Sequence, residues 1–190
     1  MSNLNLADFH SKKPKIKYAC AKRAIEISRE NPAALYPDFD FFVKLLDGEN
    51  RIIKWTAIRV IGNLSGADNK ERVDEFLPLF FSFLKGKELI TAANAIGALS
   101  DIARNKPKHK GKILKQLLCV EKAVYYNRGK VSPECRNVAL GHVMTVLDGF
   151  CDEIKGCKET LGFIKRHTAN TRPAVAKKAK DLLEKLSPQS

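Results

Sequence analysis

Cysteine and histidine are the side chains of this sequence that could bind a metal ion. A structural zinc site needs four ligands of this kind, and the candidates are His142, Cys151, Cys157 and His167. Their successive spacings of 9, 6 and 10 residues match no compact zinc module. Single cysteines in helices are commonly packed in the core. We therefore expect no metal site and no cofactor.

One further pair has the composition of a nucleophile and its base. Cys135 and His142 are seven residues apart, which in a helix places them on one face, roughly 10 Å apart. That separation is too long for a direct hydrogen bond. The sequence also has no glycine loop for phosphate and no Gly-x-Ser-x-Gly turn. We name no catalytic residue, and an enzyme is the least favoured class.

Cations interleaved with tyrosines form the best candidate for binding. Residues 102–147 carry ten Lys/Arg against two Asp/Glu, whereas residues 24–101 carry nine against twelve. Cations neutralise phosphates or pair with acidic partners, and tyrosines stack on bases. The candidate binding residues are Arg104, Lys106, Lys108, Lys110, Lys112, Tyr125, Tyr126, Arg128, Lys130 and Arg136.

These residues leave three interpretations open. If they form one patch, Lys108, Lys110, Lys112, Arg128 and Lys130 should converge near Tyr125 or Tyr126 and bind nucleic acid or an acidic protein. The alternative is a solvated connection between helices, with one tyrosine anchored in the core.

A second basic surplus, six Lys/Arg against one acid, lies in residues 1–23.

Composition indicates a globular protein. The 190 residues are 44% hydrophobic and 29% charged, with net charge +13, which is not the balance of a disordered chain. No apolar run could cross a bilayer, and the N-terminus lacks the pattern of a signal peptide. The five cysteines are odd in number and include no Cys-x-x-Cys. We expect a soluble, cytoplasmic protein without a membrane partner.

A repeated motif indicates how the chain positions these residues. A small or apolar residue, an apolar residue, Gly, any residue and an apolar residue recur around Gly62, Gly97 and Gly141, 35 and 44 residues apart. Such periods are typical of stacked helix pairs. We expect the three glycines to be buried where repeats meet, so that Gly97→Leu would overpack a joint.

Apolar residues at helical spacing predict the helices themselves. The second, small-residue helices are expected over 16–28, 52–64, 90–103 and 174–186. The bulkier first helices are expected over 39–46, 73–84 (interrupted by Pro78) and 113–126, with a shorter one containing 161–167. At least eight helices in antiparallel pairs, and no β-sheet, are therefore predicted.

Residues 35–104 resemble HEAT repeats. Pro78 matches the proline that the first helix of that family often bears, Asp47 and Asn50 match its polar turn, and the second helices run towards a sequence like Ala-Leu-Gly-x-Leu. The match is weaker beyond residue 110, and armadillo repeats are similar enough to fit equally well. The resemblance implies an all-α, right-handed superhelix of stacked antiparallel helix pairs, with the second helices on its concave face.

The resemblance also implies an organisation and a class of function. We expect one domain over 1–190, with clear repeats at about 35–70, 72–107 and 110–154 and a terminal cap at 156–186. The leading hypothesis is a non-enzymatic protein-interaction or scaffold module that binds a partner on its concave face or its basic third repeat. The alternative is a nucleic-acid-binding protein related to the HEAT-like DNA glycosylases, with Trp55 near the duplex; the more ordinary role for Trp55 is sealing the gap between repeats.

Overall fold

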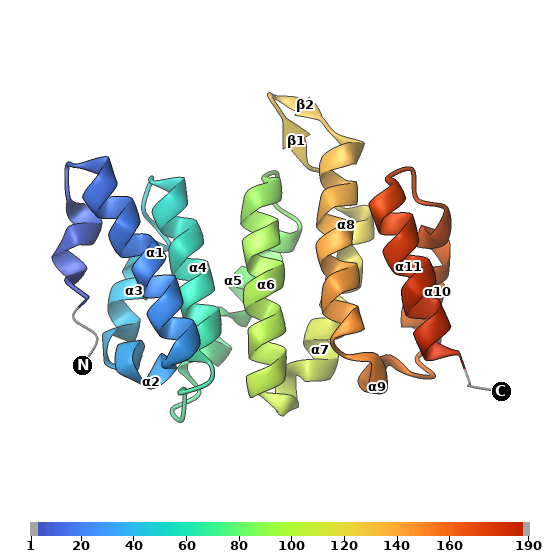
Figure 1. The fold of residues 1–190 in the computed structure, drawn as a ribbon, viewed down its shortest axis with the longest axis horizontal. Coiled ribbons are helices and arrows are strands. Elements are labelled where there is room, and N and C mark those ends of the chain that lie inside the picture. The colour runs from blue at the N-terminus through green and yellow to red at the C-terminus, as the bar shows by residue number, and fades with distance from the viewer. Residues whose placement is uncertain (1–3, 188–190) are drawn as a thin grey trace. The chain divides into compact units, whose positions relative to one another are not determined.

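The computed structural model describes residues 4–187, which form a chain of helices (Figure 1). This confirms the all-α fold class. The α-helices are α1 (Pro14–Glu30), α2 (Pro32–Leu35), α3 (Phe39–Leu45), α4 (Arg51–Leu64), α5 (Leu77–Leu84), α6 (Leu89–Asn105), α7 (Pro107–Leu117), α8 (Pro133–Asp148), α9 (Cys151–Ile154), α10 (Lys158–Arg166) and α11 (Pro173–Leu186). Short 3-10 turns are η1 (Leu6–His10), η2 (Tyr36–Asp38), η3 (Arg72–Phe76), η4 (Leu118–Lys122) and η5 (His167–Ala169).

Local sequence explains where many of these helices begin. Proline is the first residue of α1, α2, α7, α8 and α11, a position where its missing N–H costs nothing. The side chain of Asn50 caps α4 by accepting a hydrogen bond from the Ile53 amide at 3.2 Å. Ser132 caps α8 in the same way through the amide of Cys135, also at 3.2 Å.

The predicted second helices are confirmed, but two of the first helices are not. The segment 73–84 is divided into η3 and α5, with Pro78 as the second residue of α5. The predicted helix 113–126 begins earlier, at Pro107, and α7 ends at Leu117. The proline before the basic run starts a helix, so much of the expected loop 104–112 is helical.

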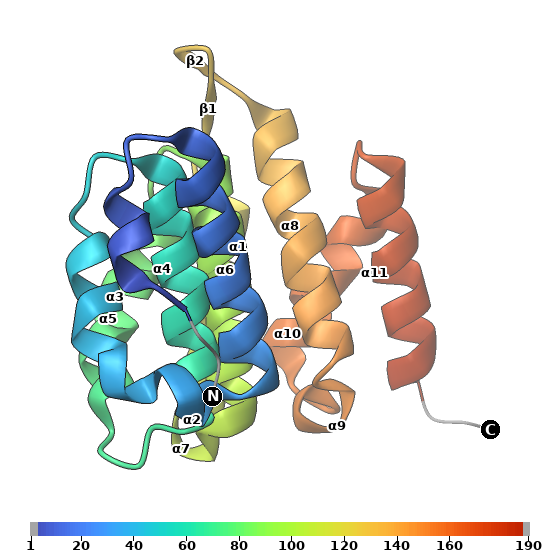
Figure 2. The same cartoon turned by 60° about the vertical axis from the view of Figure 1, so that its left-hand side comes forward.

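The expectation of no β-sheet is wrong at one place. Tyr126–Asn127 (β1) and Lys130–Val131 (β2) form a two-stranded antiparallel hairpin. The hairpin extends beyond the N-terminal end of α8 (Figures 1 and 2). All four of its strand residues are exposed. The sheet therefore lies on the surface of the helical fold and adds nothing to the core.

Backbone contacts divide the chain into two compact units. Unit 1 comprises residues 1–80 and 97–110, and unit 2 comprises residues 81–96 and 111–190. In unit 1, α4 packs against both α1 and α3. Phe39, Phe42, Ile58 and Ile61 are completely buried there. The expected single domain over 1–190 stays a prediction.

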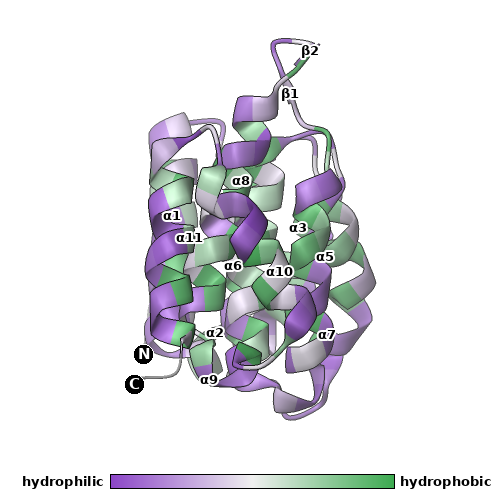
Figure 3. Cartoon of the chain, turned by 90° about the vertical axis from the view of Figure 1, so that its right-hand side faces the viewer, coloured by the Kyte–Doolittle hydropathy of each residue, from purple (hydrophilic) through white to green (hydrophobic). Residues whose placement is uncertain are grey.

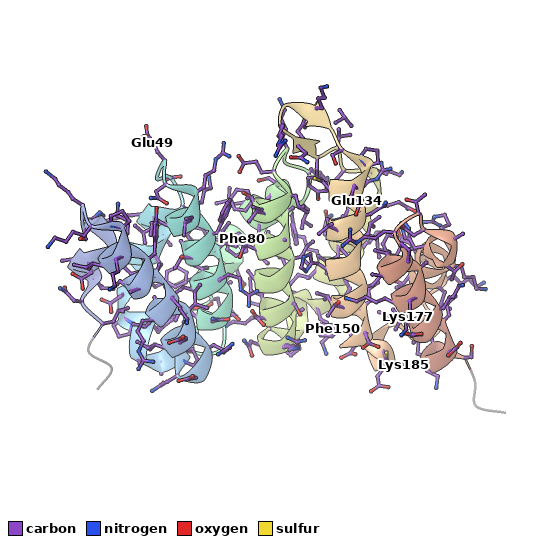
Figure 4. All side chains as sticks on the ribbon, turned by 45° about the horizontal axis from the view of Figure 1, so that its top comes forward. Glu49, Phe80, Glu134, Phe150, Lys177 and Lys185 are labelled. Carbon is purple, nitrogen blue, oxygen red and sulfur yellow. The ribbon has the colours of Figure 1, made fainter. Side chains whose placement is uncertain are left out.

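Unit 2 buries a core of its own. Helix α11 packs against α8 and α10, and Leu147, Phe163 and Ala179 are buried among them. Each helix of the chain carries both hydrophobic and hydrophilic residues (Figure 3), and the labelled Lys177 and Lys185 project from α11 (Figure 4). Burial of such apolar faces supplies the main driving force for folding.

The three repeated glycines turn out to differ. Gly62 is buried, and a Cβ there would lie 2.6 Å from the Cα of Ala98, so only glycine fits. Gly97 is half-buried under the guanidinium of Arg59, which occupies the place of a Cβ. Gly141 is half-buried, with Val175 3.5 Å from where its Cβ would lie. The overpacking expected at Gly97 therefore falls at Gly62, because Gly97→Leu would displace only the flexible end of Arg59.

We predict that Gly62→Ala lowers the free energy of unfolding by about 1–3 kcal/mol, because the backbone of α6 would have to move. Gly141→Ala is the matched control. Its methyl group would make an ordinary contact with Val175, so it should leave stability unchanged or raise it by up to about 1 kcal/mol. Urea denaturation of the two variants checks this, and equal midpoints would contradict the close packing at Gly62.

Candidate binding surface

The ten predicted binding residues fall into two groups. Arg104, Lys106, Lys108 and Lys110 belong to unit 1, whereas the other six, Lys112, Tyr125, Tyr126, Arg128, Lys130 and Arg136, belong to unit 2. Their convergence into one patch stays a prediction. Within each unit, however, the structure gives every group a definite environment.

In unit 1, Lys106 pairs with a buried carboxylate. Its Nζ lies 3.4 Å from Oδ2 of Asp68, whose side chain is fully buried, and it also donates to the backbone carbonyl of Asp68. The Lys106 side chain is itself only 14% exposed. Lys106 is thus a structural cation, since a buried carboxylate that lost its partner would be costly.

Asp68 is held in its charged form by several donors. Burial by itself would raise the pKa of Asp68. The hydroxyl of Tyr36 donates to it at 2.6 Å, and the amides of Arg72 and Val73 each donate at 3.0 Å. Together with Lys106, these hydrogen bonds bring the pKa of Asp68 below its ordinary value. The carboxylate therefore anchors the segment that leads into η3.

The next cations of unit 1 also face acids. The Nζ of Lys108 lies 2.5 Å from Glu71 and 2.8 Å from Asp74. Nε2 of His109 lies 2.8 Å from the other oxygen of Asp74. Burial alone would raise the pKa of Asp74, but these donors lower it. Ion pairs therefore connect the start of α7 to η3 and to Glu71, the residue that precedes η3.

Two arginines share one carboxylate between α4 and α6. Arg59 lies 3.3 Å from Oδ2 of Asp101, and Arg104 lies 3.4 Å from Oδ1. Burial raises the pKa of Asp101 in spite of both arginines. The glycine at position 97 leaves the space that the Arg59 guanidinium fills on its way to Asp101. Acids remote in sequence thus neutralise much of the charge of the basic segment in unit 1.

In unit 2, the two adjacent tyrosines have opposite roles. Tyr125 is fully buried, and its hydroxyl donates to the carbonyl of Leu84 at 2.7 Å. Burial raises the pKa of Tyr125 to about 12. Tyr126 is 40% exposed. Only Tyr126 can therefore contact a partner, while Tyr125 anchors the hairpin to α5.

The hairpin turns through two residues in left-handed conformation. Arg128 has φ 49° and Gly129 has φ 77°, and the strands pair Tyr126 with Val131 and Asn127 with Lys130. Two successive positive φ angles are the requirement of a type I′ turn. The sequence Asn-Arg-Gly-Lys contains a signal for this turn, because glycine readily adopts the second angle. The turn leaves the side chain of Arg128 at the exposed tip.

The segment between α5 and α6 supports the hairpin from one side. The amide of Tyr126 donates to the carbonyl of Lys87 at 3.0 Å, and Nζ of Lys87 lies 5.8 Å from the centre of the Tyr126 ring. Ser132 donates to the carbonyl of Tyr125 at 2.9 Å. We call the exposed side chains of this region the hairpin surface: Lys87, Tyr126, Arg128, Lys130 and Val131.

Arg136 and Lys112 lie in other surroundings within unit 2. Lys112 has its Nζ 5.8 Å from the ring of Phe81. Arg136 is a half-buried residue of α8, and its charge contributes to lowering the pKa of His167. Neither contact involves the hairpin surface, which therefore contains Tyr126, Arg128 and Lys130 of the six predicted residues.

His167 belongs to a polar network at the C-terminal end of α10. Arg166 makes two hydrogen bonds of 2.8 Å to Glu121, and Nε2 of His167 lies 3.4 Å from the same carboxylate. Burial lowers the pKa of His167. The carboxylate of Glu121 raises this pKa, and the charges of Arg166 and Arg136 lower it. Hydrogen bonds from Arg166 lower the pKa of Glu121. The network joins α10 to η4.

The described part of the chain contains no group of three His, Cys, Asp or Glu that could hold a metal ion. In residues 4–187 all five cysteines are free thiols. His142 is an exposed residue of α8, and burial of part of its ring lowers its pKa. None of the helices in that range is long and apolar enough to span a membrane.

A shallow hollow between α8 and α11 gives no sign of a small-molecule site. Its volume is about 220 Å³. The ammonium groups that line it already have acceptors: Lys178 donates to Thr145 and Lys185 to Asp148, both at 2.6 Å. These contacts join the two helices across the hollow.

Sequence reasoning missed Lys87 and Asp68. Lys87 lies 39 residues before Tyr126, and only the fold brings its carbonyl and ammonium to the hairpin. Asp68 lies in the short stretch Ala-Asp-Asn, which matches none of the motifs considered above. No sequence signal identifies its role, because its partners Tyr36 and Lys106 lie 32 and 38 residues away.

Comparison with known proteins identifies the fold. A designed armadillo repeat protein, solved in complex with the peptide (KR)4, is 15% identical with a TM-score of 0.58, over 96% of this chain and 80% of its own. An engineered protein is 16% identical with a TM-score of 0.54, over 95% of this chain and 46% of its own. No protein-family model and no curated protein matches the sequence. The fold is an armadillo- or HEAT-like helical repeat, as the sequence resemblance indicated.

We predict that Lys106→Met lowers the free energy of unfolding by about 2 kcal/mol, because the buried carboxylate of Asp68 loses its cation but keeps its neutral donors. Lys130→Met removes the same charge from an exposed strand and should change stability by less than about 0.5 kcal/mol. Thermal or urea unfolding distinguishes the two variants. Equal stability would mean that Lys106 has no structural role.

A second prediction concerns the dependence of stability on pH. The unfolded chain binds a proton on His167 near pH 6.5, whereas burial makes the folded protein bind it only at lower pH. The free energy of unfolding should therefore fall as pH drops below about 6.5. His167→Gln should flatten this fall, whatever its effect on stability at neutral pH. His10→Gln, at an exposed position, is the control for replacing a histidine outside this network.

Proposed function

We propose that this chain is a non-enzymatic protein-interaction module that binds an acidic segment of a partner protein through its hairpin surface. The observation that carries the proposal is that the hairpin is exposed to solvent and is also held in place by hydrogen bonds. Residues 126–131 are all exposed, yet Tyr125 and Lys87 fix the hairpin to the helices through hydrogen bonds of 2.7 and 3.0 Å. A surface held in place before binding loses less conformational entropy when a partner docks.

The side chains of the hairpin surface suit a carboxylate-bearing chain. Arg128 and Lys130 supply two cations around the turn, and no Asp or Glu occurs between Lys122 and Ser132. Tyr126 and Val131 are 40% and 59% exposed. Aromatic and aliphatic side chains beside cations favour a peptide that carries both acidic and apolar residues. The partner class is therefore an acidic protein segment.

Net charge supports the same sign of partner. Unit 2 carries 17 Lys/Arg against nine Asp/Glu. The similar designed armadillo protein was solved with the basic peptide (KR)4, so that protein binds a peptide. A chain with net charge +13 would repel a basic peptide and attract an acidic one. In its specific form, the proposal is that this chain also binds a peptide, but an acidic one.

The nucleic-acid hypothesis has less support in unit 2. Stacking needs aromatic rings that a base can reach, and the burial of Tyr125 leaves Tyr126 as the one exposed tyrosine of the Tyr125-Tyr126 pair. Val131 adds an apolar contact that phosphate does not use. In unit 1, Lys106 and Lys108 already pair with acids. Trp55 is half-buried in α4, and this position does not support a role for it in a glycosylase-like site.

We predict that the protein binds a fluorescent (DE)4 peptide and not a (KR)4 peptide at low salt, as measured by fluorescence anisotropy. Arg128→Gln with Lys130→Gln should weaken binding about threefold to tenfold. Lys155→Gln with Lys158→Gln removes two exposed charges elsewhere in unit 2 and should leave binding nearly unchanged.

Two outcomes would contradict this proposal. Equal losses in both double variants would mean that net charge, and not the hairpin surface, attracts the peptide. Tighter binding of a single-stranded oligonucleotide than of (DE)4, with a steep salt dependence set by the number of phosphate contacts, would restore the nucleic-acid hypothesis.

A further inference from the structure

The second basic surplus of the sequence lies on a different surface, at the beginning of α1. Residues 9–25 contain six Lys/Arg and no Asp or Glu. Lys12, Lys13 and Lys15 are exposed, and two of them precede Pro14, the first residue of α1. The proposed function leaves this cluster without a role.

Exposed apolar side chains accompany these lysines. Ile16 is 40% exposed and Tyr18 is 37% exposed in the first turns of α1. Ile52, the second residue of α4, is 43% exposed. The side-chain amide of Asn50 donates to the hydroxyl of Tyr18 at 3.5 Å, which places the beginning of α4 beside the beginning of α1.

These residues share one end of unit 1. Helices α1 and α4 pack side by side and run in the same direction, so their N-terminal ends lie together (Figure 1). We name this surface the α1 edge: Lys12, Lys13, Lys15, Ile16, Tyr18 and Ile52. Farther along α1, Lys22 and Arg23 pair with Glu26. The acids nearest in sequence to the α1 edge itself are Asp8, Asp47 and Glu49.

We infer that the α1 edge docks on the anionic headgroups of a phospholipid membrane, with Ile16, Tyr18 and Ile52 entering the headgroup layer. Two weak attractions act together in such binding: lysines are drawn to the surface potential, and apolar side chains leave water at the boundary with the acyl chains. Surface binding requires no spanning helix. The lack of a spanning run and of a signal-peptide pattern, from which we expected no membrane partner, does not bear on binding at the surface.

The composition of the α1 edge favours a lipid surface over other anionic partners. Its exposed cations are lysines, which act as point charges, whereas discrete carboxylates and phosphates are better matched by the planar fork of arginine. Exposed isoleucines add nothing to the binding of a phosphate backbone, but they stabilise insertion among lipids. Tyrosine is enriched at membrane interfaces because its ring is apolar and its hydroxyl is polar.

Sedimentation with vesicles tests this inference on the full chain. One set of vesicles contains phosphatidylcholine alone, and in the other about a third of the lipid is phosphatidylserine. The wild-type protein should bind the phosphatidylserine vesicles only, and more weakly as salt rises. Lys12→Gln, Lys13→Gln and Lys15→Gln together should weaken binding about a hundredfold.

Matched variants separate the α1 edge from net charge. Lys155→Gln, Lys158→Gln and Lys165→Gln remove three exposed charges from unit 2 and should have little effect. Ile16→Ser with Ile52→Ser keeps the charge and should weaken binding about tenfold. Both substitutions are at exposed positions, and circular dichroism checks that the variants remain folded.

Each contrary result overturns the inference. Failure of the wild type to bind either vesicle excludes a membrane surface. Equal losses in the two triple variants mean nonspecific attraction by net charge. Unchanged binding of Ile16→Ser with Ile52→Ser excludes insertion. If (DE)4 displaces the protein from vesicles and the α1-edge variant no longer binds (DE)4, the edge is a site for acidic proteins. Arg128→Gln with Lys130→Gln should bind vesicles normally, so this inference and the proposed function can fail separately.

Discussion

The contact between α4 and α6 at Gly62 and Ala98 is the constraint on which the packing of unit 1 depends. At this point the helices are so close that a single added methyl group would meet backbone at 2.6 Å. Helices that approach this closely bury their apolar faces with few voids. Arg59 can then cross from α4 over Gly97 and reach Asp101 on α6. Close packing and this ion pair thus use neighbouring small positions of the same helix.

The ion pairs of unit 1 depend on the way its helices pack. Because helices far apart in sequence become neighbours, acids and bases that belong to different segments meet. Lys106 reaches Asp68, and Lys108 reaches Glu71 and Asp74. A basic segment counted along the sequence therefore loses much of its charge in the folded unit. Other cations, such as Lys130 in unit 2 and Lys13 in unit 1, stay exposed and are available to a partner.

The two proposed surfaces use different physical means of presentation. The hairpin surface is a short sheet held by a buried tyrosine hydroxyl and one backbone hydrogen bond, so its geometry is fixed before binding. The α1 edge is made from the first turns of two parallel helices, and it combines lysines with half-exposed apolar side chains. A fixed surface favours one partner geometry, whereas lysines beside apolar groups favour a broad anionic layer. Neither surface requires catalysis.

The sequence by itself determined the helical class, the second helices and the repeated pattern, because apolar spacing and small residues are local signals. It also allowed for a solvated connection between helices in which one tyrosine is anchored in the core. Only the tertiary structure decided which glycine is essential, since Gly62 and Gly141 share a motif but face different neighbours. Likewise, the two adjacent tyrosines are alike in sequence, yet Tyr125 is buried and donates to the carbonyl of Leu84, whereas Tyr126 is exposed. Burial and ion pairing depend on residues brought together from distant segments, and one sequence contains no local signal for those distances.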